Sequence, residues 1–225
     1  MTVVKQLAVS SVMLLVNIVV FYVAAGSIDE RARMFFIASA LHYSVSILMQ
    51  YRLNPELLAA RLVLRREGSK RWDEIVMRGS NLVVLLAMPA VAGFDVGRWQ
   101  GTRLDTLFVI PGILLFLLSS VLLNWAMAVN PYFEPTVRIQ RDRDHRAVTQ
   151  GPYRIVRHPG YLAGIAYVLS APLIIGSSLA MIPAGIYLLL IVLRTALEDN
   201  TLRQELAGYI EYAKTVKYRL LPGIW

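Results

Sequence analysis

Long apolar runs separated by short polar segments dominate the first 130 residues. Four such runs cover residues 6–25, 34–49, 79–94 and 104–129, and a membrane-spanning helix needs about 20 apolar residues. The second and third runs are short and carry polar side chains, so we expect them to extend into flanking turns or to face other helices. We expect the first run to be a retained helix and not a signal peptide. The pattern therefore predicts four membrane-spanning helices.

A fifth apolar region, residues 161–193, is too long for one ordinary span, and Pro172, Gly176 and Pro183 interrupt it. At about 1.5 Å per residue it fits two short helices of about 22 Å each, folded back as a hairpin. Such a hairpin barely reaches across a hydrocarbon core of about 30 Å. We therefore predict an all-α integral membrane fold with about five membrane elements, the last of which is a helical hairpin.

Composition supports a membrane protein. Of 225 residues, 56% are hydrophobic and 17% are charged, and the mean hydropathy is +0.53, whereas soluble domains carry about a quarter charged residues. The absence of cysteine excludes disulfides, zinc-thiolate sites and thiol nucleophiles. One compact membrane domain is the simplest interpretation.

The net charge of +8 would suggest a nucleic-acid partner in a soluble protein, but in a membrane protein it reports orientation. If the N-terminus is cytoplasmic and the fifth region is a hairpin, 19 of the 23 basic residues fall on the cytoplasmic side. Only Arg31, Arg33, Arg98 and Arg103 then lie outside. This agrees with the positive-inside rule. We expect a multi-pass protein with both termini in the cytoplasm and no nucleic-acid partner.

Polar side chains that could take part in a reaction cluster in the segment 131–160, in residues 194–199 and in the C-terminal tail, residues 202–225. The hairpin would bring residues 157–161 and 194–199 to one membrane surface. On a helix, Arg194 and Glu198 share a face, so Arg194 pairs with Glu198 or flanks the same cavity. Taken singly, each feature also fits a surface ion pair or a helix start at the interface. His145 and His158 lack metal-ligand spacing, so no metal site is expected.

The order and spacing of these residues resemble the isoprenylcysteine carboxyl methyltransferase family, within a wider group that includes phospholipid N-methyltransferases. The resemblance covers the segment from His145 to the end of the chain. Its matching positions are His145, Val148, Gly151, Pro152, Tyr153, Arg157, His158, Pro159, Tyr161, Arg194, Glu198, Asp199, Leu202, Tyr209, Tyr212 and the ending Arg219, Leu220, Leu221, Pro222. This chain has Asp199 where the family commonly has a second Glu, and Ala163, followed by Gly164, where Gly is common.

The resemblance implies an S-adenosylmethionine-dependent methyltransferase in which Glu198 holds the methionine end of the cofactor and Arg194 faces the methyl acceptor. The acidic residue after Glu198, Asp199, is carried over as a catalytic residue. The remaining cofactor-binding residues implied by position are His145, Arg146, Ala147, Val148, Tyr153, His158, Pro159, Gly160 and Tyr161. A carboxylate acceptor needs no base, whereas an amine or thiol would call on Asp199, Glu198 or His158.

The expected organisation is a transmembrane scaffold of four spans, residues 1–130, followed by a cytosolic-facing catalytic region, residues 131–225. The catalytic region would contain a cofactor loop, the hairpin and a C-terminal helix. The expected partners are membrane lipids and a lipophilic acceptor, most simply an isoprenylcysteine-like carboxylate. Lipid amine N-methylation and small-thiol S-methylation remain alternatives, as does a non-catalytic transporter or lipid-binding subunit. The oligomeric state does not follow from the sequence.

Overall fold

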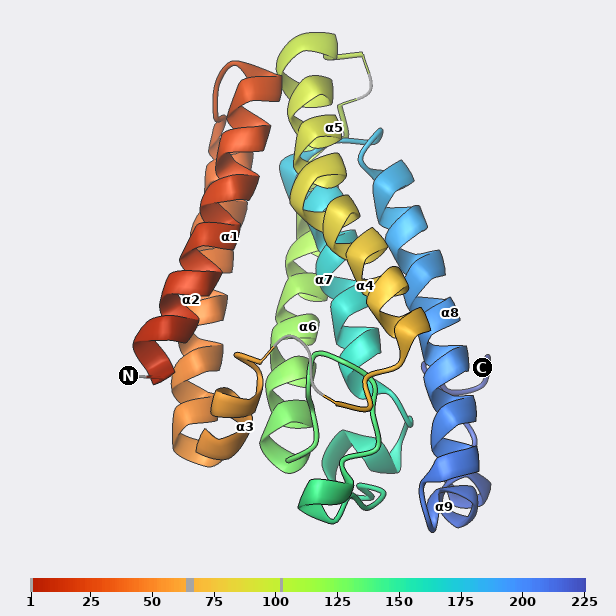
Figure 1. Ribbon diagram of the computed structural model, residues 1–225. Helices are drawn as coiled ribbons and strands as arrows, with labels where there is room; N and C mark the ends of the chain where they lie inside the picture. The colour runs from red at the N-terminus through yellow and green to blue at the C-terminus, as the bar shows by residue number, and fades with distance from the viewer. Residues whose placement is uncertain (1, 64–66, 102) are drawn as a thin grey trace.

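The computed structural model describes residues 2–63, 67–101 and 103–225, which form a bundle of long helices (Figure 1). Five helical segments are long and apolar enough to cross a membrane. They are α1 (Thr2–Ala25), α2 (Glu30–Leu53), Arg71–Trp99, Thr106–Val129 and α8 (Met181–Glu205). α7 (Pro159–Ile175) is apolar but shorter. The described residues contain no strand, and the predicted all-α fold with about five membrane elements is confirmed.

Two of these spans are composite. Arg71–Trp99 joins α4 (Arg71–Leu82) and α5 (Met88–Phe94) through the π-helical turn Val83–Ala87, and a second π-helical turn, Asp95–Trp99, ends it. Thr106–Val129 consists of the 3-10 turn Thr106–Phe108 and α6 (Val109–Val129). The third predicted span, residues 79–94, is therefore extended at both ends, and the second, residues 34–49, is likewise extended to Glu30–Leu53 by α2.

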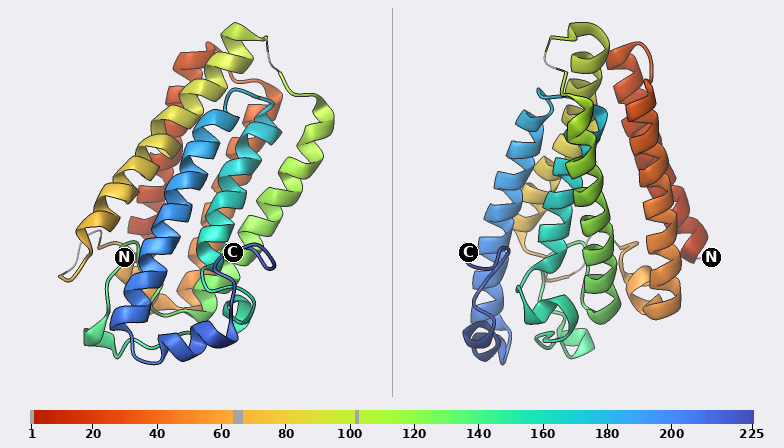
Figure 2. Two further views of the ribbon diagram at one scale, coloured as in Figure 1. Left: turned by 90° about the vertical axis from the view of Figure 1, so that its right-hand side faces the viewer. Right: turned by 180° about the vertical axis from the view of Figure 1, so that it is seen from behind.

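Short elements gather at one end of the bundle, here called the loop end. It holds α3 (Pro55–Ala60), the segment 130–158 and α9 (Tyr209–Thr215) (Figures 1 and 2). Two 3-10 turns, Arg141–Arg143 and Gly151–Arg154, shape the segment between α6 and α7. Chain segments that are far apart in the sequence therefore lie together at the loop end of the bundle.

The predicted hairpin is formed by α7 and α8, and buried polar groups fix its turn at the far end. Gly176 ends α7 with φ +91°, a conformation that glycine adopts without strain. Arg31 donates hydrogen bonds to the carbonyls of Leu173 and Ile174 at 2.8 Å. The buried carboxylate of Asp95 accepts from the Ser177 hydroxyl at 2.6 Å. The turn is therefore held by both α2 and the Arg71–Trp99 span.

The two arms of the hairpin are unequal, which differs from the expectation of two arms of about 22 Å. α7 has 17 residues and α8 has 25, so they measure about 25 Å and about 37 Å. α8 does not stop at residue 193 but continues through Arg194 and Glu198 to Glu205. The polar residues expected at the hairpin exit consequently sit on a regular helix with fixed directions.

The outer surface of the bundle is apolar along the spans. α1 has only 6% of its most apolar window buried, and it exposes side chains such as Val12, Leu15 and Val23. Inside the bundle, Phe35 and Phe116 pack edge to face with ring centroids 6.2 Å apart. Since water would not solvate so much exposed apolar surface favourably, the surface is suited to contact with lipid.

Candidate active site

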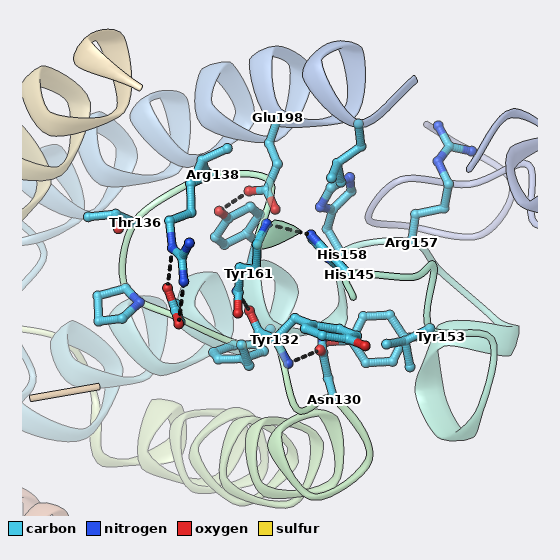
Figure 3. A pocket seen from close by; sticks show the side chains of 18 of the residues that line it. Asn130, Tyr132, Thr136, Arg138, His145, Tyr153, Arg157, His158, Tyr161 and Glu198 are labelled. Atoms are coloured by element: carbon cyan, nitrogen blue, oxygen red, sulfur yellow. Dashed lines mark hydrogen bonds and ion pairs between the residues drawn. The ribbon is translucent and has the colours of Figure 1, made fainter. Parts of the chain in front are cut away.

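A cavity of about 320 Å³ opens at the loop end, between the segment 130–158, the first turns of α7 and the C-terminal half of α8 (Figure 3). Ten of the twelve residues predicted from the sequence line it. They are His145, Arg146, Ala147, Val148, Tyr153, His158, Gly160, Tyr161, Arg194 and Glu198. Pro159 begins α7 beside the cavity, and neither it nor Asp199 belongs to the lining.

Ion pairs shape the loop that forms one wall. Arg138 is buried and donates to Glu134 at 2.9 Å and to Asp142 at 2.7 Å. Gln140 donates to the carbonyl of Tyr132 at 2.8 Å. These contacts fold the segment back on itself, so that Tyr132, Arg138 and His145 surround the same space (Figure 3).

His145 is held as a neutral side chain in this wall. Its ring packs on Tyr132 with centroids 4.4 Å apart, and its Nδ1 accepts from the backbone N–H of Gln140 at 3.4 Å. Burial, followed by the nearby positive charge of Arg138, lowers the pKa of His145 to about 4. The imidazole is therefore uncharged at neutral pH.

Tyr153 anchors the lower part of the cavity. Its hydroxyl accepts a hydrogen bond from the side-chain amide of Asn130 at 2.7 Å, and its carbonyl accepts from the hydroxyl of Tyr212 at 2.7 Å. Burial raises the pKa of the Tyr153 hydroxyl above its usual value. The hydroxyl thus stays protonated and can donate a hydrogen bond to a ligand.

Glu198 points into the cavity from α8, and the Tyr161 hydroxyl donates a hydrogen bond to it (Figure 3). The His158 ring stacks on Tyr161 with centroids 5.6 Å apart and planes within 7°. Among the described residues, no Lys or Arg forms a salt bridge with Glu198. Within the described ranges, the hydrogen-bond partner of this cavity carboxylate is therefore a neutral hydroxyl.

Arg194 also faces the cavity, but its acidic partner is Asp73 on α4 and not Glu198. Its Nε donates to the buried carboxylate of Asp73 at 2.6 Å, and its Nη2 donates to the carbonyl of Pro135 at 2.8 Å. The guanidinium lies 5.0 Å from the centroid of the Tyr161 ring. Within the described part of the chain Nη1 has no hydrogen-bond partner, so one donor nitrogen remains for a ligand.

Asp199, for which the resemblance implies a catalytic role, does not line the cavity. It is fully buried and accepts from Arg157 at 2.6 Å, from Arg203 at 3.0 Å and from Arg219 at 3.0 Å. The Tyr209 hydroxyl donates to the same carboxylate at 3.0 Å. A carboxylate shared by three guanidinium groups is a poor proton acceptor. Asp199 instead joins α8 to the tail.

Sequence reasoning missed the contribution of the N-terminal half to this cavity. Arg61 and Met77 line it, and Asp73 fixes Arg194. Arg61 falls in a basic stretch that by itself suggests orientation or contact with anionic lipid. The one available signal was Asp73, an acidic residue close to Lys70 and Arg71 that precedes the predicted span at residues 79–94. Among the described residues, no three His, Asp or Glu side chains are grouped as metal ligands.

Residues 112–204 match the isoprenylcysteine carboxyl methyltransferase (ICMT) family. The resemblance seen in the sequence motifs is therefore confirmed over the segment that runs from α6 through most of α8. A search of curated proteins finds no match. The ICMT segment includes the loop wall, Tyr161, Arg194 and Glu198, whereas Arg61, Asp73 and the tail after residue 204 lie outside it.

Proposed function

We propose that the protein transfers a methyl group from S-adenosylmethionine to the carboxylate of a lipophilic, isoprenylcysteine-like acceptor. The observation that carries this proposal is a single cavity that holds both a carboxylate, Glu198, and a guanidinium, Arg194; among the described residues Glu198 forms no salt bridge and Nη1 of Arg194 has no hydrogen-bond partner. It lies at the end of a bundle whose outer surface suits lipid. The site would thus combine charged groups for a polar cofactor with a position at the end of an apolar helix bundle.

The residues of the cavity fit the cofactor in size and chemistry. Its volume of about 320 Å³ falls at the lower end of ordinary small-molecule sites, about 300–1,000 Å³. Glu198 would receive the ammonium group, because a half-buried carboxylate gains most from a cation that replaces its lost hydration. Residues 145–148 and Tyr153 would hold the remainder. The bound cofactor would supply an electrophilic methyl group on a positively charged sulfur.

Arg194 would orient the acceptor carboxylate through its free Nη1, because Asp73 and Pro135 already fix the rest of the guanidinium. That carboxylate would be the nucleophile toward the methyl group that the bound cofactor supplies, and the transfer would leave a neutral ester and a neutral thioether. Both reacting charges disappear, so a cavity with little water favours the step. Holding the three atoms in line supplies much of the remaining rate enhancement.

A carboxylate acceptor suits this site better than an amine or a thiol. An amine or thiol must lose a proton. Of the three candidate bases, Asp199 does not line the cavity, and its carboxylate accepts hydrogen bonds from three arginine side chains. A carboxylate is already ionised at neutral pH. Because O-methylation of a carboxylate needs no base, the burial of Asp199 is no obstacle to it.

The direct test is methyl transfer by the purified protein in detergent. We expect it to move radiolabelled methyl from S-adenosylmethionine to S-farnesyl-N-acetylcysteine as a base-labile ester. Arg194→Lys keeps the charge but loses the planar fork, so kcat/KM should fall at least about tenfold while cofactor binding by calorimetry persists. Label on phosphatidylethanolamine in place of the acid, or unchanged turnover in Arg194→Lys, would contradict the proposal.

A further inference from the structure

Arg61 is a half-buried cation in the wall of the cavity. It follows α3, its Nη1 donates to the carbonyl of Phe133 at 3.2 Å, and its guanidinium lies 5.5 Å from the centroid of the Phe133 ring. Phe133 in turn packs so closely on Gly160 that a Cβ there would overlap its ring. The guanidinium is thus fixed against the start of α7 by a carbonyl and an aromatic face, both uncharged.

Arg61 differs in this respect from the other arginine residues of the cavity wall. Each of those has a carboxylate partner: Arg138 has Glu134 and Asp142, Arg146 has Asp144, Arg157 has Asp199 and Arg194 has Asp73. In the described part of the chain, Arg61 forms no ion pair. Burial and the charge of Arg194 lower the pKa of Arg61 only to about 10, so it remains charged at neutral pH. A half-buried cation without a counter-charge has lost part of its hydration, and an anionic ligand offsets that loss.

We propose that Arg61 binds the acceptor carboxylate together with Arg194 and makes the cavity select an anionic acceptor over its methyl ester. This inference rests on the proposed function, because it assigns a second residue to the same acceptor. It adds a specificity-determining side chain from the N-terminal half, outside the ICMT segment.

The position of Arg61 favours the acceptor carboxylate over that of the cofactor. Arg61 and Arg194 both line the cavity, and they donate hydrogen bonds to the carbonyls of Phe133 and Pro135, two residues apart in the same loop wall. The charge of Arg194 also lowers the pKa of Arg61. The cavity lining also includes the apolar side chains of Met77 and Leu123. A carboxylate attached to an apolar chain matches two cations beside an apolar wall.

A consequence concerns the product. Methyl transfer converts the carboxylate to a neutral ester, so the paired anion of Arg61 is lost when the reaction is complete. The buried guanidinium then disfavours the product relative to the substrate. Arg61 would therefore promote product release as well as substrate selection.

The test compares binding of S-farnesyl-N-acetylcysteine with binding of its methyl ester, using the full protein in detergent. We expect the wild type to bind the acid at least about tenfold more tightly than the ester, and Arg61→Gln to lose most of that preference. Arg61→Lys should retain part of it, because a point charge replaces the fork. Arg78→Gln is the matched control, since its side chain is 78% exposed on α4 and does not line the cavity.

Two results would overturn the inference. One is an equal acid-to-ester preference in Arg61→Gln and Arg78→Gln. The other is an Arg61→Gln variant that keeps the preference but binds S-adenosylmethionine more weakly, which would assign Arg61 to the cofactor carboxylate. Because binding needs no turnover, either failure is distinguishable from failure of the proposed function, in which the wild type produces no methyl ester.

Discussion

The pair of Asp73 and Arg194 links two halves of the chain through one buried contact. Asp73 is fully buried and accepts both from Arg194 and from the backbone N–H of Val137 at 2.8 Å. It therefore fixes the direction of Arg194 and the position of the loop wall at once. In our proposal Asp73 is a positioning residue, because it acts on the acceptor only through Arg194.

A double-mutant cycle separates positioning from stability. Asp73→Asn leaves Arg194 without its buried counter-charge, and we expect this to lower the free energy of unfolding by about 3–5 kcal/mol and to raise the KM for the acceptor. Adding Arg194→Gln removes the unpaired charge, so it should restore stability but not turnover. Thermal unfolding and steady-state kinetics measure the two effects. Recovery of turnover in the double variant would contradict the role given to Arg194.

His145 predicts how stability depends on pH. Its pKa is about 4 in the folded protein, against an ordinary value of 6.5, so the unfolded chain binds a proton over this interval and the folded protein does not. Stability should therefore fall as the pH drops from about 6.5 to about 4, by roughly 2–3 kcal/mol. His145→Asn keeps an acceptor for the Gln140 N–H but does not titrate. Unfolding midpoints at several pH values should show a steeper loss in the wild type; equal slopes would refute the assignment.

At the scale of elements, the close contact between α6 and α7 fixes where α7 lies relative to the cavity. Gly112 on α6 faces α7 so closely that a Cβ would lie 2.8 Å from Ile174 Cγ1 and 2.9 Å from Leu173 Cβ. This approach sets α7, and with it Tyr161, against the loop wall. Small residues at such crossings let membrane helices pack by van der Waals contact.

Two glycine substitutions test this packing. Gly112→Ala should destabilise the protein by about 1–3 kcal/mol, because the helices must separate or distort. Gly185→Ala on α8 is the control, since a Cβ there meets no atom within 4 Å, and it should leave stability unchanged or raise it slightly. Melting temperatures in detergent give the comparison. Equal losses at the two positions would show that the α6–α7 contact is not close packed.

The elements also show what the sequence could predict. Apolar length and the breaks at Pro172 and Gly176 were sufficient for the spans and for the hairpin, because both depend on local properties of the chain. A prediction of the ion-pair partner of Arg194 was open to error, because Asp73 is 121 positions away in the sequence and the helical spacing favoured Glu198. The burial of Asp199 was equally out of reach, because two of its partners, Arg157 and Arg219, come from other elements.

At the scale of the molecule, charge and topology agree. Arg31, Arg98 and Arg103 contact the turns at the far end, through the carbonyl of Ile174, the carbonyl of Val23 and the carboxylate of Asp29. The cavity and most other basic residues belong to the loop end. The positive-inside rule then predicts that the loop end, and with it the proposed cofactor site, faces the cytoplasm, where a polar cofactor is accessible.

Orientation can be measured cleanly because the chain has no cysteine. Thr215→Cys introduces a thiol at an exposed position of the loop end, and Thr106→Cys introduces one at an exposed position of the far end. With a membrane-impermeant maleimide on intact cells, we expect Thr106→Cys to be labelled, and Thr215→Cys to be labelled only after permeabilisation. Each variant serves as the control for the other, since both thiols should react once the membrane is opened. Labelling of Thr215→Cys in intact cells would place the cavity outside the cytoplasm. The basic residues of the loop end would then not mark the side from which the cofactor enters.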